Sequence, residues 1–140
     1  MKTPKVFIDS NVWFSAFYGS ANCEKITEAH TENKIKAVIS QKVLQEIVKN
    51  FTQKMPNALD PFIKTVSVIP SKIIRDPTKI PQHVKSLAHP KDQNILASAI
   101  LAKVNCFVTD NTKHFKTNEI KKKTGIKIVT PKQAVKILNL

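Results

Sequence analysis

Glycine and cysteine are both scarce in this chain of 140 residues, which contains 2 of each. Two glycines are too few for a glycine-rich phosphate-binding loop. Cys23 and Cys106 lie far apart and form no Cys-x-x-Cys pair, so the sequence indicates neither a disulfide framework nor a structural zinc site. We expect Cys106 to pack as a small apolar residue.

Long apolar segments are also missing. The longest, Ile95 to Ala102, is much too short to span a bilayer. Met1 to Lys5 lead directly into a predicted strand, so we see no signal peptide and expect a cytoplasmic protein without a membrane partner. The length and the hydrophobic fraction of 41% fit a single globular domain over residues 1–140.

Acidic side chains are few. The chain has 10 Asp and Glu against 23 Lys and Arg, which gives a formal net charge of +13. Such a field attracts polyanions, and nucleic acid is the commonest candidate inside cells. Charge alone is equally consistent with lysine-rich helix faces that are simply solvated.

Short apolar runs alternate with helical patterns along the chain. We predict strands at residues 5–9, 37–40, about 67–69, 105–109 and 127–129. We predict helices at residues 21–32, 41–54, 56–66, 94–102 and 131–138. Ser40 is the expected N-cap of the second helix, Thr130 with Pro131 starts the last, and Gly125 ends a lysine-rich helix before it. The proline-containing stretch 69–89 is predicted to be an irregular connection with one short helix.

This alternation implies parallel strands joined by right-handed crossovers, with helices on both faces of the sheet. The predicted fold class is therefore α/β, a three-layer α/β/α domain with a central parallel sheet of four to five strands.

Four acids sit where such a fold would bring them together, and three of them stand at the ends of predicted elements. Asp9 follows the first strand, Asp110 follows the fourth, Asp92 opens a helix and Glu46 lies on the helix after the second strand. Open α/β sheets bind ligands at the carboxyl ends of their strands, so we expect these four side chains to converge. Taken singly, each also has an ordinary explanation as a helix cap, a turn residue or a solvent-facing acid.

Converging carboxylates need a counter-charge. Two of them about 4 Å apart repel by about 4 kcal/mol at an effective dielectric of about 20. A cluster must therefore hold protons or a cation, and a divalent metal is the simpler solution. Asn11 offers a further oxygen donor just past Asp9. The four histidines show no metal-ligand spacing, and we expect them at the surface or behind the ligands.

Four segments resemble the signature segments of the PIN-domain nucleases. They are Val6-Phe7-Ile8-Asp9-Ser10-Asn11-Val12, Val43-Leu44-Gln45-Glu46-Ile47, Asp92-Gln93-Asn94-Ile95-Leu96-Ala97-Ser98-Ala99 and Val108-Thr109-Asp110-Asn111-Thr112-Lys113-His114-Phe115. The resemblance spans nearly the whole chain, and its specificity comes from the order and spacing of four short motifs. A free-standing unit of this length is similar to the VapC-type toxins of toxin–antitoxin pairs.

The resemblance implies a PIN-like domain that cleaves RNA phosphodiester bonds as a metal-dependent endoribonuclease with Mg²⁺ or Mn²⁺. It implies Asp9, Glu46, Asp92 and Asp110 as catalytic residues, Asn11 and Asn111 as supporting residues, and the four acids with Asn111 as metal ligands. The family's Thr-x-Asn pattern places Asn111 in the fourth ligand position, so Asp110 and Asn111 both stay candidates. His89 stands where relatives often carry another acid. The implied partners are RNA, a small antitoxin protein and a second copy in a homodimer.

Three other functions remain open at this stage. The first is a non-catalytic RNA-binding PIN-like module with a degenerate metal site. The second is a phosphoryl-transfer domain in which Asp9 is phosphorylated, although Asn11 stands where a phosphatase places an acid. The third is a basic α/β domain with a structural role.

Overall fold

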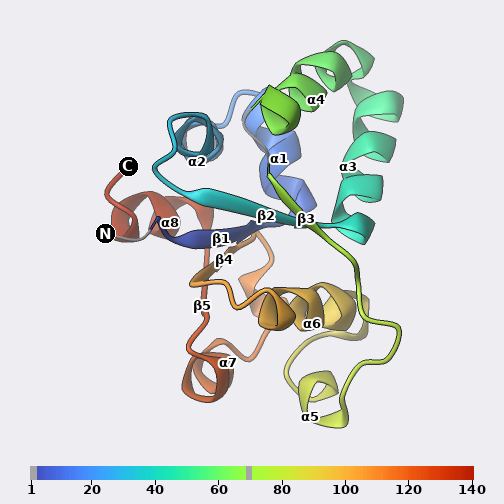
Figure 1. Cartoon of the computed structure of the whole chain (residues 1–140), viewed down its shortest axis with the longest axis vertical. Coiled ribbons are helices and arrows are strands. Elements are labelled where there is room, and N and C mark those ends of the chain that lie inside the picture. The colour runs from blue at the N-terminus through green and yellow to red at the C-terminus, as the bar shows by residue number, and fades with distance from the viewer. Residues whose placement is uncertain (1–2, 69–70) are drawn as a thin grey trace.

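The computed structural model describes residues 3–68 and 71–140, and its centre is a parallel sheet (Figure 1). The strands are β1 (Lys5–Ile8), β2 (Lys36–Ser40), β3 (Lys72–Ile74), β4 (Cys106–Val108) and β5 (Lys127–Val129). They lie in the order β3-β2-β1-β4-β5, and every neighbouring pair is parallel. All five carboxyl ends therefore reach the same edge of the sheet.

The register places β1 at the middle of the sheet between β2 and β4. Phe7 pairs with Phe107 across β1 and β4, and their rings stack with centroids 4.8 Å apart. The ladder continues past the strands, because the Asp9 amide donates to the Val108 carbonyl and the Thr109 amide to the Val129 carbonyl, both at 3.0 Å. Asp9 and Thr109 are thus fixed side by side just beyond the sheet.

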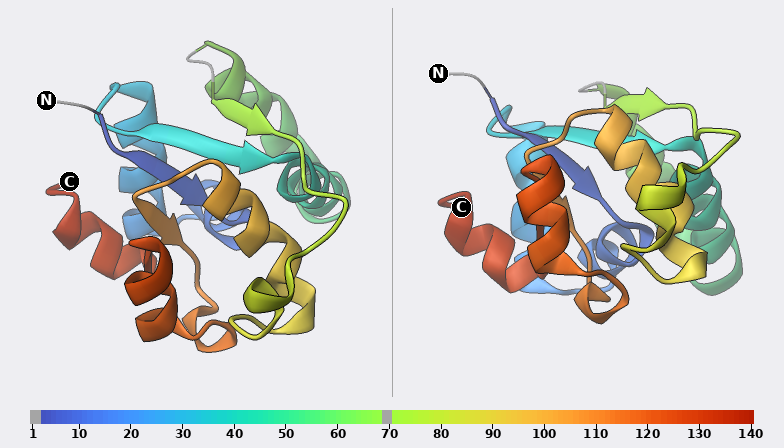
Figure 2. Two further views of the ribbon diagram at one scale, coloured as in Figure 1. Left: turned by 60° about the horizontal axis from the view of Figure 1, so that its bottom comes forward. Right: turned by 90° about the horizontal axis from the view of Figure 1, so that it is seen from below.

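Helices cover both faces of this sheet. Figures 1 and 2 show α1 to α4 on one side and α5, α6 and α7 on the other, and α8 packs against α2, β4 and β5. The helices are α1 (Ser10–Phe17), α2 (Ala21–Thr31), α3 (Gln41–Lys54), α4 (Leu59–Val68), α5 (Gln82–Lys85), α6 (Gln93–Leu101), α7 (Thr117–Thr124) and α8 (Pro131–Ile137). Single 3₁₀ turns occur at Pro56–Ala58, Pro90–Asp92 and Thr112–His114. Over the described residues, no helix is both long and apolar enough to cross a membrane.

The predicted three-layer α/β/α class is confirmed, and so are most of its elements. Helix α3 has the predicted bounds, with the Ser40 hydroxyl accepting from the Val43 amide as its N-cap. Helix α8 begins at Pro131 behind a Thr130 capping box, and Gly125 ends α7 with a left-handed φ of 78°. These elements form where local sequence signals predict them, because caps and periodicity are local properties.

The predicted third strand at 67–69 is wrong where the structure describes it. Ser67 belongs to the last turn of α4, Ile69 lies outside the described residues, and β3 runs instead over Lys72–Ile74 within the supposedly irregular stretch. Valine near position 68 suits a strand, but α4 packs on α3 and continues through Val68. No helix was predicted between residues 9 and 21, and α1 is a full helix of 8 residues there.

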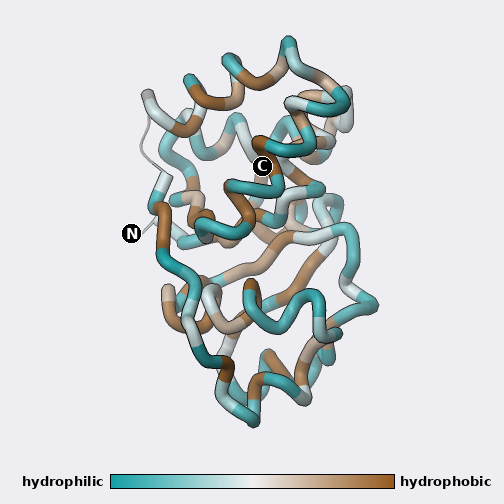
Figure 3. Tube along the Cα trace, turned by 90° about the vertical axis from the view of Figure 1, so that its right-hand side faces the viewer, coloured by the Kyte–Doolittle hydropathy of each residue, from teal (hydrophilic) through white to brown (hydrophobic). Residues whose placement is uncertain are grey.

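An aromatic cluster forms the core between α1, α3 and α4. Trp13, Phe51 and Phe62 are fully buried, and the Trp13 and Phe62 rings meet edge to face at 5.4 Å. Phe14 stacks on Phe51 at 5.5 Å. Figure 3 colours the chain by hydropathy and shows hydrophobic residues gathered in the central strands and hydrophilic residues in the outer loops. Trp13 and Phe14 thus both serve the packing of this core.

Candidate functional site

Asp9 is the most constrained residue of the candidate site. It follows β1, caps α1 and is 5% exposed. Its Oδ1 accepts the Ser10 amide at 2.7 Å, and its Oδ2 accepts the Thr109 hydroxyl at 2.8 Å. The Asn11 side-chain amide lies 3.4 Å from the same Oδ2. Each oxygen of this carboxylate therefore has a hydrogen-bond donor, and its orientation is fixed.

The environment of Asp9 favours its protonated form. Burial raises its pKa from 3.8 to about 6, against the hydrogen bonds from Thr109 and Ser10 that lower it. The negative charges of Glu46 and Asp92 contribute a smaller part of this rise. Glu46 and Asp92 therefore both lie within electrostatic reach of Asp9, although the three come from the end of β1, from α3 and from the start of α6.

Glu46 reaches toward this edge from the second turn of α3. Its Oε2 accepts a hydrogen bond of 3.0 Å from the Ser10 hydroxyl, which links α3 to the first residue of α1. The residue is otherwise exposed, and its second carboxylate oxygen has no hydrogen-bond partner among the described residues and faces outward from the core. Ser10 thereby contacts both acids, through its backbone to Asp9 and through its side chain to Glu46.

Asp92 is held from the opposite side. It is the N-cap residue of α6 and its side chain is 15% exposed. Its Oδ2 pairs with His114 Nδ1 at 2.8 Å, and His114 lies in the 3₁₀ turn after β4. One Asp92 oxygen is thus committed to the imidazole, which leaves the other for a ligand.

Asp110 and Asn111 follow β4 and are both exposed. The Asp110 amide donates to Asn11 Oδ1 at 3.2 Å, and the Asn111 amide donates to the Thr109 hydroxyl at 3.1 Å. The Asp110 carboxylate is not among the charges that shift the pKa of Asp9. It acts on Cys23, whose thiol pKa is raised mainly by burial and in smaller part by Asp110.

Two polar residues near these acids escaped sequence reasoning. Thr109 is fully buried, and its hydroxyl orients Asp9 while accepting from the Asn111 amide. Asp76 follows β3 and joins the two helices near the site, because it accepts the Lys42 amide of α3 and the Ser98 hydroxyl of α6, both at 2.8 Å. Asp9 and Asp110 were selected because each follows a predicted strand. Asp76 also follows a strand, but it was not selected because the third strand was predicted at about 67–69 instead of 72–74.

The histidines divide between surface and core. His83, His89 and His114 are exposed, as expected. His30 is 1% exposed, so its predicted surface or peripheral place is wrong. Its ring nitrogens lie 3.4 Å from the Ala37 amide and 3.1 Å from the Ser71 hydroxyl, so hydrogen bonds inside the fold compensate its burial.

The candidate site has side chains of the kind that bind metal ions, but they are not arranged around one ion position. Asp9, Glu46 and Asp92 supply the carboxylate oxygens that hard cations prefer, and their mutual repulsion is visible in the pKa of Asp9. Within residues 3–68 and 71–140, no three His, Cys, Asp or Glu side chains are close enough together to hold an ion as they stand. Side-chain rotation of exposed Glu46 and partly exposed Asp92 would be needed to close such a site.

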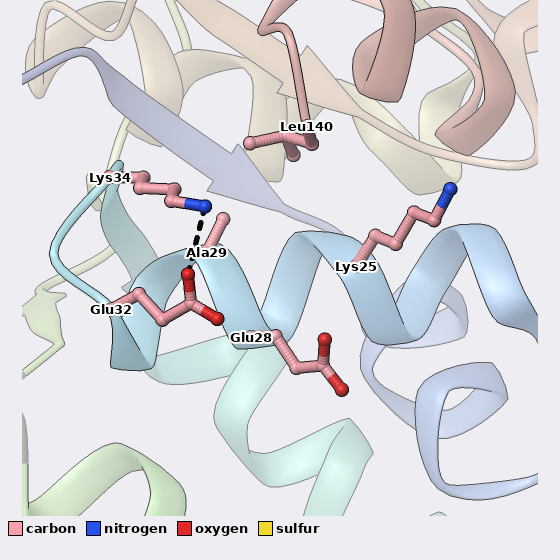
Figure 4. A pocket seen from close by; sticks show the side chains of 6 residues that line it. All are labelled: Lys25, Glu28, Ala29, Glu32, Lys34 and Leu140. Carbon is pink, nitrogen blue, oxygen red and sulfur yellow. Dashed lines mark ion pairs between the residues drawn. The ribbon is translucent and has the colours of Figure 1, made fainter.

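A second group of charges lies away from these acids. Lys25, Glu28, Glu32 and Lys34 surround a small hollow of about 100 Å³ between α2 and Leu140 (Figure 4). Lys34 Nζ pairs with Glu32 at 2.9 Å. Both signs of charge are balanced there, and none of the candidate acids lines the hollow, so we do not assign the function to it.

Comparison with known proteins agrees with this geometry. A family model described as "PIN domain" matches residues 5–113. A structure titled "Toxin-antitoxin complex from Klebsiella pneumoniae" is similar with a TM-score of 0.59 at 20% identity, over 90% of this chain and 97% of that one. "Crystal structure of VapBC2 from Rickettsia felis bound to a DNA fragment from their promoter" has a TM-score of 0.59 at 17% identity, over 90% and 98%. No curated protein matches significantly.

The fold and the acids at its carboxyl edge define an α/β/α domain of the PIN type. The match covers well over half of the sequence, and the chain belongs to the PIN domain family. The two solved structures share the fold across almost their whole length.

Proposed function

We propose that this protein is a metal-dependent endoribonuclease that hydrolyses RNA phosphodiester bonds, and that it acts as the toxin of a toxin–antitoxin pair. The observation that carries the proposal is the buried Asp9 carboxylate, coupled to Glu46 and Asp92 at the carboxyl edge of the sheet. Its PIN domain membership supports nuclease chemistry, and the net charge of +13 favours a polyanionic substrate.

Mg²⁺ or Mn²⁺ fits this donor set because all three side chains offer carboxylate oxygens. Asp9, Glu46 and Asp92 would hold the ion, with Asp110 or Asn111 as the fourth ligand and Asn11 in support. When bound, the ion would supply an activated water and positive charge beside the phosphate. Thr109 orients Asp9, Ser10 orients Glu46 and His114 orients Asp92 through the hydrogen bonds described above.

The neighbours' titles, which describe toxin–antitoxin complexes, support an antitoxin as the proposed protein partner, and the homodimer is proposed from the family resemblance alone. We propose a small antitoxin protein that blocks the site, a homodimer, and a cytoplasmic location. Coexpression with the protein encoded by the adjacent gene should give a soluble complex that no longer cleaves RNA.

The test is cleavage of structured RNA with and without divalent ions. Wild type should cleave with Mg²⁺ or Mn²⁺ and lose cleavage with EDTA. Asp92→Asn should abolish cleavage while the protein stays folded, and Asp60→Asn, at an exposed site on α4, is the matched control that should cleave normally. Retained cleavage in Asp92→Asn would remove that residue from the mechanism.

The second candidate is a non-catalytic RNA-binding module of the same fold. It is favoured by the exposed Asp110, whose charge acts on Cys23 rather than on Asp9. Metal titration separates the two, since a binding module would bind RNA with a steep salt dependence but show no metal-dependent turnover.

A further inference from the structure

Two loops beside Asp92 are joined into a short antiparallel pair. The His89 amide donates to the His114 carbonyl, and the Lys116 amide donates to the Leu87 carbonyl, both at 2.8 Å. Between them, Ala88 and Phe115 form an antiparallel bridge. Residues 86–89, before α6, are thus tied to residues 113–116, after β4.

The joined loops rest on the hydrophobic core. Leu87 is fully buried and Phe115 is 6% exposed. The Phe115 ring packs on Phe107 of β4 with centroids 5.2 Å apart. Gln93 braces the first loop, since its side-chain amide donates to the carbonyls of Lys85 and Ala88. The loops are therefore anchored before any ligand arrives.

A cavity of about 330 Å³ opens between these loops. That volume lies in the usual range of small-ligand sites, roughly 300–1,000 Å³. Lys113, Lys116, His89 and His114 line it, and no acidic side chain does. The His89 and His114 rings are neighbours there, with centroids 5.2 Å apart and planes inclined by 30°, so the cavity wall carries two adjacent aromatic rings.

This cavity is next to the candidate site. His114 lines the cavity and also contacts Asp92. His89 Nδ1 accepts the Lys91 amide at 3.3 Å, within the turn that leads into Asp92. A chain of nucleotides whose phosphate reached Asp92 would pass over the two histidines and the two lysines.

We propose that this cavity is a subsite for one nucleotide of single-stranded RNA beside the bond to be cleaved. The base stacks on the His89 and His114 rings, and Lys113 and Lys116 contact its phosphates. Unpaired RNA is favoured because a base must be free of its duplex to stack on side chains. This inference rests on the proposed nuclease function and adds where the substrate binds.

Charge is tested by the double variant Lys113→Ala, Lys116→Ala. Its matched control is the double variant Lys36→Ala, Lys72→Ala. These two exposed lysines are the first residues of β2 and β3, at the sheet edge opposite to the candidate site. Binding of a short fluorescent single-stranded RNA is measured by anisotropy in EDTA, across a salt series. Loss of two phosphate contacts should weaken binding roughly tenfold and reduce the salt slope by about 1.4, at about 0.7 per contact. The control should shift binding by less than about twofold, because distant charge contributes only a screened field.

Stacking is tested by His89→Asn, which keeps a side-chain acceptor for the Lys91 amide and removes the ring. His83→Asn is its control, an exposed histidine that does not line this cavity. His89→Asn should weaken RNA binding by roughly fivefold or more, and a 2-aminopurine base in the RNA should lose its quenching. Neither change should occur in His83→Asn.

The outcomes separate this proposal from the nuclease proposal. If the lysine double variant binds RNA as its control does, the subsite is overturned even when the wild type cleaves. If the wild type binds RNA with these variant effects but never cleaves, the nuclease function fails, and only nucleotide binding at this cavity stands, without its place beside a cleaved bond. A wild type that does not bind single-stranded RNA at low salt overturns the subsite directly.

Discussion

Replacing Asp9 with Asn should stabilise the protein at neutral pH, which is unusual for a buried polar residue. The carboxyl group has a pKa of about 6 in the folded protein against 3.8 for its ordinary value. The folded state therefore binds the proton more tightly than the unfolded state between these pH values. Where the folded state holds more protons, the free energy of unfolding falls as pH rises.

The size of the effect follows from the shift. About two pKa units at 1.36 kcal/mol each correspond to roughly 3 kcal/mol of cost for the ionised Asp9 above pH 6. The stability that the protonated Asp9 contributes is fully present below about pH 4 and is lost as the pH rises through about 6. Asn carries no charge but offers only one acceptor to the Ser10 amide and the Thr109 hydroxyl, a loss of about 1 kcal/mol. The free energy of unfolding of Asp9→Asn should therefore exceed that of the wild type by roughly 2 kcal/mol at about pH 7.5.

The measurement is urea unfolding in EDTA followed by fluorescence of Trp13, the single and fully buried tryptophan. Asp9→Asn should be more stable than wild type at about pH 7.5 and no more stable at about pH 4. Asp60→Asn, exposed on α4, should show no such difference. An Asp9→Asn protein that is equally or less stable than wild type at about pH 7.5 would refute burial as the cause of the raised pKa.

The remaining predictions concern the residues that position the acids. Thr109→Val should lose most RNA cleavage, because it leaves Asp9 without its hydroxyl donor and the Asn111 amide without its acceptor, and Thr109→Ser should restore it. Equal cleavage rates for the two variants would count against this role. Asp76→Ala should lower the free energy of unfolding by about 1–3 kcal/mol, since it leaves the Lys42 amide unpaired and leaves the Ser98 hydroxyl only the Asn94 carbonyl as acceptor. Chemical denaturation measures this loss, and an unchanged midpoint would contradict it.

Much of the fold could be predicted from sequence because its signals are local. The period of Val43, Ile47 and Phe51 defines the buried face of α3, and all three are fully buried. Alternating strands and helices predicted parallel pairing, which β1 to β5 confirm. The third strand was misplaced because β-branched residues near its predicted position are compatible with either structure, and packing of α4 on α3 decided between them.

The sequence by itself determined that the chain is basic and that acids stand at strand and helix ends. The tertiary structure alone decided what each acid does. Asp9 and Thr109 are 100 positions apart, and they meet because β1 and β4 pair in parallel register. Burial at that junction raises the pKa of Asp9, whereas Asp110, one residue beyond Thr109, stays exposed. A side chain's solvation and charged neighbours depend on distant segments, so no local pattern could have separated these two aspartates.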